Sequence, residues 1–230
     1  MIYIMSDIHG DCTRFLHMLG KIEFSRLDTL YILGDVIDRG TENLKMLDYC
    51  MGRKNIILLK GNHEYFLQHM FEDESFRQQW WDWDGENTIR ELDKLSRTRK
   101  QVYYEYVKSL PLYVELEMDR EKFFLTHSGY DADMEHVVKD GEIVCLDTMQ
   151  KLEDEQHYLL SYDLHTMPAS LKFDQRFVVG HLPTMFIESG RPGKIYRHTT
   201  YIDVDCGNSS RETGGMLGCL SLDTMQEWYL

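Results

Sequence analysis

Short apolar runs alternate with amphipathic stretches along the first sixty residues. The runs at 2–5, 30–33 and 56–59 predict three buried β-strands. The stretches between them repeat apolar side chains at the spacing of an α-helix. This order of strands and helices predicts parallel strands connected by right-handed crossovers.

Each connecting helix has a polar residue that can cap its N-terminus, Asp11 for the first and Thr41 for the second. The buried helix faces are expected to carry apolar residues three or four positions apart: Phe15, Leu16, Leu19 and Ile22, then Leu44, Leu47 and Met51. A third helix is expected from about Tyr65. Residues 72–110 predict mostly helix, and we expect two of the tryptophans Trp80, Trp81 and Trp83 to fill core.

The second half of the chain is richer in predicted strands. They are expected at 122–125, 176–179, 201–204 and 217–222, with a last edge strand at 225–230. Proline is scarce, with 4 residues, and no Gly/Ser tract interrupts the chain. The pattern therefore predicts a single α/β domain over residues 1–230, with two sheets packed together and helices outside.

Composition and charge narrow the functional classes. The chain is 43% hydrophobic and 28% charged, which is typical of a globular protein, and no apolar run approaches the ~20 residues of a membrane span. Its net charge of -14 argues against nucleic-acid binding, and it would repel anionic substrates unless a metal site reversed the sign locally. An odd count of five cysteines and no export signal favour reduced thiols and a cytoplasmic location.

Five of the predicted strands end directly in residues of the types that bind metals. The segments are SDIHG at 6–10, GDVIDRG at 34–40, GNHE at 61–64, HSG at 127–129 and GH at 180–181. Because the carboxyl ends of strands in an α/β sheet form its ligand crevice, these ends should meet. The side chains expected to converge are Asp7, His9, Asp35, Asn62, His127 and His181.

This ligand set combines imidazole, carboxylate and amide groups. Such a mixture suits manganese, iron or zinc and does not suit calcium, which prefers oxygen alone. Six ligands are too many for one small open site, so two ions that share one carboxylate are expected. Metal pairs about 3.5–4 Å apart stabilise the attacking and leaving oxygens of a phosphoryl displacement.

These motifs resemble the PPP-type serine/threonine phosphatases of the calcineurin-like metallophosphoesterase superfamily, especially the small bacterial and phage enzymes. The resemblance is nearly continuous from Ile2 to Glu64 and recurs at WDGENTIREL (83–92), His127, His181 and IDVDCG (202–207). Residues 130–175 match least. The resemblance implies a metallophosphoesterase-like four-layer α/β/β/α sandwich with two mixed sheets.

The resemblance also implies a role for each matching residue. Asp7 and His9 would hold the first metal ion, and Asp35 would bridge both ions. Manganese is the expected metal, ahead of iron or zinc. The second ion would be held by Asn62, His127 and His181. Arg39 would grip the phosphate with Asn62 and His63, and His63, oriented by Asp38, would protonate the leaving oxygen. Hydrolysis would proceed by direct attack of a metal-bound hydroxide, without a phosphoenzyme.

Two positions depart from the family pattern. Ser6 stands where the family usually has glycine. More importantly, the family's second phosphate-binding arginine normally lies between the HSG and GH motifs, where this chain has only Arg176. Arg176 stands at the start of its predicted strand, about 16 Å from the ligand end, so a structural role is expected for it. The residue that replaces the second arginine, if one does, stays open.

Three functions remain, in descending order of expectation. The first is a serine/threonine protein phosphatase that acts on a phosphoprotein or a small phosphoester, with no nucleic-acid or membrane partner. The second is a symmetrical dinucleoside tetraphosphate hydrolase, but those relatives typically have alanine at the position of Asp38 and aspartate at that of Glu64. The third is a non-catalytic scaffold on the same fold. The pattern leaves the physiological substrate, the metal and the oligomeric state open.

Overall fold

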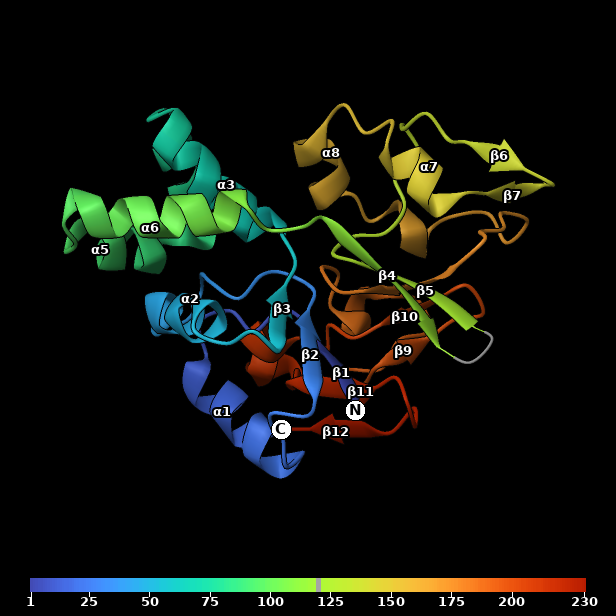
Figure 1. Ribbon diagram of the computed structural model, residues 1–230, viewed down its shortest axis with the longest axis horizontal. Helices are drawn as coiled ribbons and strands as arrows, with labels where there is room; N and C mark the ends of the chain where they lie inside the picture. Colours follow the sequence, from blue (N-terminus) through green and yellow to red (C-terminus); the bar gives the residue numbers. More distant parts are fainter. Residues whose placement is uncertain (119–120) are drawn as a thin grey trace.

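Both faces of the predicted strands carry apolar side chains, and both faces are covered in the computed structural model, which describes residues 1–118 and 121–230. Two five-stranded mixed sheets pack face to face, and helices cover their outer faces (Figure 1). This is the α/β sandwich with two mixed sheets that the sequence predicts.

The first sheet has the strand order β12-β11-β1-β2-β3. Its strands are β1 (Ile2–Met5), β2 (Thr29–Ile32), β3 (Ile56–Leu58), β11 (Gly218–Ser221) and β12 (Glu227–Tyr229). The first three strands are parallel, with Ile4 opposite Tyr31, while β11 runs antiparallel to β1 and β12 antiparallel to β11. The C-terminal edge strand expected from the sequence is confirmed as β12.

The second sheet has the order β4-β5-β8-β10-β9. Its strands are β4 (Tyr113–Met118), β5 (Glu121–Thr126), β8 (Arg176–Val179), β9 (Tyr196–Arg197) and β10 (Tyr201–Asp203). The central strands β5, β8 and β10 are parallel, and the edge strands β4 and β9 pair antiparallel. A small hairpin of β6 (Val138–Lys139) and β7 (Glu142–Ile143) projects beyond this sheet (Figure 1).

The helices follow the chain in two groups. The first group is α1 (Cys12–Lys21), α2 (Asn43–Met51), α3 (Asn62–Glu72), α4 (Phe76–Trp80), α5 (Glu86–Asp93) and α6 (Arg97–Lys108), and the second is α7 (Cys145–Met149) and α8 (Glu155–Leu160). In Figure 1 the helices α3, α5 and α6 form a lobe on the left, and α7 and α8 form another on the right. No helix in the described parts of the chain is both long enough and apolar enough to cross a membrane.

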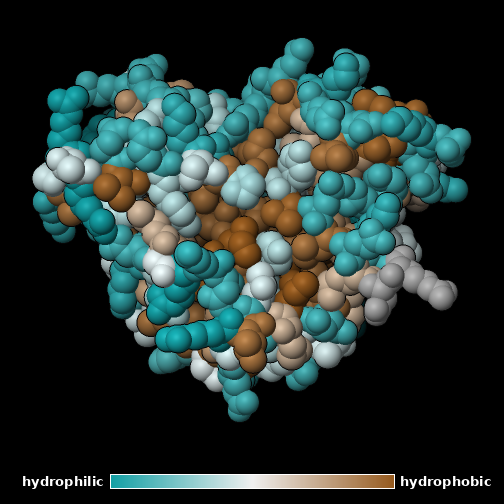
Figure 2. Space-filling model, in the orientation of Figure 1, coloured by the Kyte–Doolittle hydropathy of each residue, from teal (hydrophilic) through white to brown (hydrophobic). Residues whose placement is uncertain are grey.

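The two-residue period of the strands divides the core into layers. Ile4 of β1 packs between the sheets with Leu125 and Val178, whereas its neighbours Tyr3 and Met5 pack toward the helices. Figure 2 shows hydrophobic side chains in the middle of one face, below the notch between the two helical lobes, and hydrophilic side chains around them.

The helix starts differ in part from the sequence prediction. Asp11 caps α1 as expected, since its Oδ1 accepts the backbone N–H of Arg14 at 3.0 Å. Thr41 does not cap α2. Instead the carboxylate of Glu91 reaches over from α5 and accepts the backbone N–H groups of Asn43 and Leu44 at 3.1 and 3.0 Å. A carboxylate at a helix N-terminus satisfies the first N–H groups and complements the helix dipole.

Three predictions, on a helix face, a helix start and the tryptophans, differ in detail from the structure. Leu16 is 36% exposed, and Met18 of α1 is buried in its place. The third helix begins at Asn62 rather than near Tyr65, because Gly61 acts as its N-cap and the Glu64 carboxylate accepts the Gly61 N–H at 3.0 Å. Of the three tryptophans, Trp80 is fully buried, Trp81 is partly buried against the core, and Trp83 is 46% exposed.

Candidate metal centre

The chain turns sharply after three of the strands that lead to the site, β1, β2 and β8. Asp7, His9, Asp35 and His181 all have left-handed backbone conformations, with φ between 49° and 73°. Residues other than glycine rarely adopt this region, and such conformations persist only where the surrounding structure holds them. The turns direct the side chains of separate strand ends toward one buried point.

Asp35 lies at the centre of this convergence. Its Oδ2 is 3.4 Å from Nε2 of His127 and 3.8 Å from Nε2 of His63. Two groups of ligand atoms, each within 4.8 Å, contain it: one with His9 and His63, the other with His127 and His181. One carboxylate thus belongs to two adjacent clusters, which is the arrangement that a bridging ligand needs.

Asn62 completes the second cluster from the first turn of α3. Its Oδ1 lies 2.9 Å from Nε2 of His127 and 3.0 Å from Nδ1 of His181. Asp7 belongs to neither group, and His63 takes the place expected for it in the first. Oδ1 of Asp7 nevertheless lies 3.9 Å from Nε2 of His9, and its Oδ2 accepts the backbone N–H of His181 at 3.0 Å. The structure therefore brings all six sequence-predicted side chains to one place.

Backbone carbonyls fix the orientation of the imidazole rings. Nδ1 of His127 donates to the carbonyl oxygen of Leu33 at 2.7 Å, and Nδ1 of His9 donates to that of Ile37 at 3.0 Å. A carbonyl oxygen can only accept, so both rings carry their hydrogen on Nδ1. Nε2 of each ring is left for another partner: that of His9 lies 3.0 Å from Nη1 of Arg39, and that of His127 faces Asn62 and Asp35. Both nitrogens could bind a metal ion when they carry no proton.

The buried charges favour an ionised Asp35 beside a protonated His127, with His9 and His181 neutral. Burial and the Arg39 guanidinium hold the pKa of His9 well below its usual value, and burial with the nearby His127 lowers that of His181 to about 3. Burial opposes ionisation of Asp35, but the imidazoles of His127 and His63 outweigh it and hold its pKa well below the ordinary range. Burial likewise disfavours the charged form of His127, yet Asp35 raises its pKa to about 10.

His63 is held by a carboxylate that has two further partners. Its Nδ1 donates to Oδ2 of Asp38 at 2.6 Å, and the indole of Trp80 donates to the same oxygen at 2.6 Å. The hydroxyl of Thr88 donates to Oδ1 of Asp38. Burial disfavours the imidazolium of His63, but Asp35 and the bond to Asp38 outweigh it and raise its pKa. The arrangement favours a protonated His63 beside the clusters.

Comparison with known proteins agrees with this geometry. Residues 1–201 match the model of the calcineurin-like phosphoesterase family. The chain belongs to that family. Its members use a binuclear divalent metal centre, and the two clusters that share Asp35 are candidate ligand groups for such a centre.

Relatives within the calcineurin-like phosphoesterases carry different activities in their names. Serine/threonine-protein phosphatase 2 of Salmonella typhimurium is 27% identical over 185 residues, 79% of each chain. A symmetrical bis(5'-nucleosyl)-tetraphosphatase of Neisseria gonorrhoeae is 36% identical over 67 residues, 28% of this chain and 24% of the relative. A Saccharomyces cerevisiae serine/threonine phosphatase similar to human PP5 superposes with a TM-score of 0.58 at 17% identity, covering 95% of this chain and 71% of that one. The last similarity concerns the fold alone.

The donor set fits a pair of divalent ions. The amide oxygen of Asn62 and the carboxylate of Asp35 both face Nε2 of His127, at 2.9 and 3.4 Å. Two acceptors at this distance need a positive partner: a proton on Nε2, as the raised pKa of His127 indicates, or a metal ion that replaces it. Mixed nitrogen and oxygen donors suit manganese, iron or zinc.

Glycines let the backbone approach the ligands closely. A Cβ on Gly61 would lie 2.2 Å from Oδ1 of Asp35, and one on Gly180 would lie 2.4 Å from Oδ2 of Asp7. Glu64 then fixes the neighbouring loop. Its carboxylate accepts the N–H groups of Asp35 at 2.8 Å and Gly61 at 3.0 Å.

Sequence reasoning missed several residues around the site. Trp80 and Thr88 contact Asp38 across 42 and 50 residues of sequence. Asp84 holds Arg39, because its Oδ2 accepts the Nε–H of Arg39 at 3.2 Å and its backbone oxygen accepts the Arg39 N–H at 3.4 Å. The signal that could have found two of them is their position in the WDGENTIREL motif, which contains both Asp84 and Thr88.

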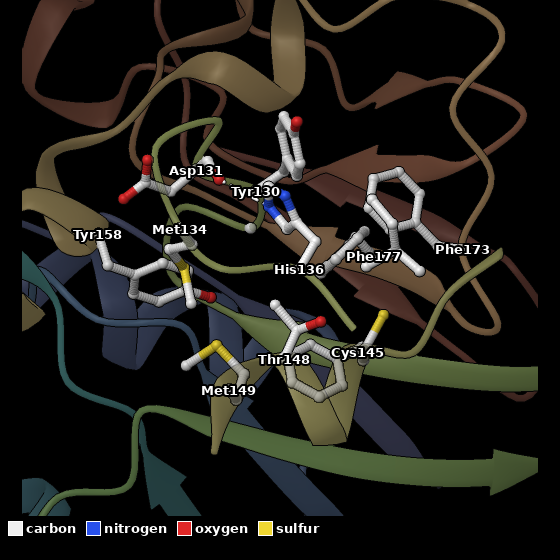
Figure 3. A pocket seen from close by; sticks show the side chains of 13 residues that line it. Tyr130, Asp131, Met134, His136, Cys145, Thr148, Met149, Tyr158, Phe173 and Phe177 are labelled. Atoms are coloured by element: carbon white, nitrogen blue, oxygen red, sulfur yellow. Dashed lines mark hydrogen bonds between the residues drawn. The ribbon is translucent and has the colours of Figure 1, made fainter. Parts of the chain in front are cut away.

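A separate cavity lies under the β6–β7 hairpin and α7. Met134, Cys145, Met149 and Tyr158 are among the residues around it (Figure 3). Its volume of about 20 Å³ has room for about one water molecule. It is too small for a substrate.

Proposed function

We propose that this protein is a phosphomonoesterase with two metal ions, and that phosphoserine or phosphothreonine in proteins is its substrate class. The observation that supports this most is the His63–Asp38 pair at 2.6 Å, placed beside two ligand clusters that share Asp35. A carboxylate-oriented imidazole next to a metal pair supplies a proton donor where a phosphate ester would be held.

In this proposal each side chain has one task. Asp7, His9 and Asp35 hold one ion, and Asp35 with Asn62, His127 and His181 holds the other. Two bound divalent ions would supply the positive charge that neutralises the phosphoryl group and activates water. Arg39 binds phosphoryl oxygens through its guanidinium, and Asn62 and His63 add hydrogen bonds to them.

Water attacks phosphorus while the bond from phosphorus to the ester oxygen breaks. His63 gives its Nε2 proton to that leaving oxygen, so the products are an alcohol and inorganic phosphate. Asp38 keeps Nε2 of His63 directed at the leaving group, because Trp80 and Thr88 hold its carboxylate in place.

Two observations favour a protein phosphatase over a dinucleoside tetraphosphate hydrolase. The match to the Salmonella phosphatase covers 79% of both chains, whereas the match to the Neisseria tetraphosphatase covers 24% of that protein. The three partners of the Asp38 carboxylate also give this side chain a role that alanine, typical of the tetraphosphatases at this position, lacks. The tetraphosphatase activity remains the second candidate.

We further propose manganese as the ion, residues 1–230 as one domain, and a phosphoprotein or small phosphoester as the partner. The test is an activity panel on the purified protein reconstituted with Mn²⁺, Fe²⁺ or Zn²⁺. Substrates are p-nitrophenyl phosphate, a phosphoserine peptide and diadenosine tetraphosphate. Faster turnover of the phosphopeptide than of the dinucleotide supports the proposal, and the reverse order supports the second candidate. No turnover of any of the three at full metal occupancy contradicts both.

A further inference from the structure

The proposed phosphomonoesterase lacks a second arginine in the segment where its relatives place one. Between His127 and His181 the chain has only Arg176. Arg176 begins β8, and its guanidinium donates to Glu121 at 3.2 Å and to the carbonyl oxygen of His198 at 3.0 Å. Because His181 follows the other end of this strand, Arg176 is turned away from the metal centre. A second guanidinium for the phosphate would therefore come from another segment of the chain.

A cavity of about 270 Å³ opens directly beside the candidate metal centre. His9 and Arg39 line it on the side of the ligand clusters, and Arg211 lines it from the loop that follows β10. A phosphate group fits easily in this volume. The cavity thus places a second guanidinium on the same space as the phosphate-binding Arg39.

The loop that carries Arg211 is anchored to the site. Gly207 turns the chain with a left-handed φ of 77°, and Nδ2 of Asn208 donates to the carbonyl oxygen of Ile8 at 2.7 Å. The hydroxyl of Ser209 accepts from Nη1 of Arg39 at 3.1 Å. The backbone two residues before Arg211 is therefore fixed against the phosphate-binding arginine itself.

Arg211 is also kept over the cavity by an ion pair. Its Nη1 lies 3.1 Å from Oδ2 of Asp11, the N-cap residue of α1, and the side chain is 54% exposed. Exposed pairs of this kind are weak, so a dianionic phosphate can compete for the guanidinium. Asp11 also contacts Arg14, with 3.7 Å between Nε and Oδ2, and keeps a cationic partner when Arg211 turns to a ligand.

We infer that Arg211 is the second phosphate-binding guanidinium of this site, reaching it from the loop after β10 rather than from the segment between the HSG and GH motifs. This inference rests on the proposed function, since it assigns the phosphate of that substrate to Arg39 and Arg211 together.

The test is phosphate binding by Arg211→Ala in the metal-loaded protein. We expect about a tenfold rise in the inhibition constant of inorganic phosphate against p-nitrophenyl phosphate, with metal content and circular dichroism unchanged. The inhibition constant of Arg211→Lys should lie between those of the wild type and Arg211→Ala, because lysine keeps the charge but lacks the planar guanidinium. Arg176→Ala is the matched control and should bind phosphate as the wild type does.

Asp11→Asn supplies a prediction of opposite sign. Asparagine also caps helices, so α1 is kept while the competing charge is removed. Phosphate affinity should rise by about 1.5- to 5-fold, the strength of an exposed ion pair.

Two results would overturn the assignment of Arg211. One is an unchanged phosphate inhibition constant in Arg211→Ala. The other is an Arg211→Ala variant that is inhibited less strongly by pyrophosphate but equally well by inorganic phosphate. Such a result would place Arg211 on a second phosphate group rather than on the scissile one. Calorimetric titration of metal-loaded protein with inorganic phosphate measures the same affinity without turnover. It therefore decides the role of Arg211 even if the protein hydrolyses no phosphomonoester.

Discussion

Replacing His63 with asparagine separates proton donation from metal binding. The imidazole is lost, but the backbone N–H of residue 63, which donates to Oδ1 of Asp35 at 3.1 Å, remains. The first turn of α3 and the neighbouring Asn62 should therefore stay in place. We expect the metal content of His63→Asn to equal that of the wild type.

The expected kinetic loss follows from the role of the ring. A positioned general acid contributes about 10²–10⁴-fold, or about 2.7–5.4 kcal/mol of transition-state stabilisation. His63 is placed to supply this in full, because Asp38 fixes its Nδ1 at 2.6 Å and is itself held by Trp80 and Thr88. The full loss should appear with a phosphoserine peptide, whose alkoxide leaving group needs a proton. It should shrink with p-nitrophenyl phosphate, whose leaving group is a weak base.

The assay compares kcat for both substrates in wild type and in His63→Asn, with elemental analysis of bound metal. His17→Asn is the matched control, since His17 lies exposed on α1. An equal loss on the two substrates would refute proton donation to the leaving group. Loss of metal from the variant would instead identify His63 as a metal ligand. Its distance of 3.8 Å to Asp35 also allows that role.

The remaining predictions concern the bridge, the phosphate grip and the thiols. Asp35→Asn should weaken both metal sites together, because one carboxylate belongs to both clusters, and a metal titration in which only one site weakens would contradict the bridge. Asp84→Asn should raise KM for p-nitrophenyl phosphate by about two- to fivefold with a smaller effect on kcat, since it loosens Arg39. The control is Asp82→Asn, whose side chain contacts Gln78 instead, and an equal KM rise in both variants would argue against positioning. Burial raises the pKa of all five thiols, those of Cys12, Cys50, Cys145, Cys206 and Cys219. Ellman's reagent should therefore label none of them in the native protein and five after denaturation. Rapid labelling of two or more thiols in the native protein would contradict this prediction.

The parallel strands of the first half and the convergence of the ligands were accessible from sequence because their causes are local. Apolar runs determine the strands, and the residue directly after a parallel strand must lie at its carboxyl edge. Asp7, Asp35 and His181 each follow such a strand, so their neighbourhood follows once the strands are known. The start of α3 was misplaced by three residues because Gly61 and Asn62 also suit a loop.

By itself the sequence identified six side chains that converge at the candidate metal centre, while the tertiary structure decided what holds and surrounds them. Glu91 caps α2 from α5 across 47 residues, and Arg211 meets Asp11 across 200. No period or spacing encodes such contacts, because they depend on how helices and loops pack after the strands have formed. Ligands grouped at strand ends are a consequence of backbone geometry. Their supporting partners are a consequence of packing, which brings distant segments together only in the folded chain.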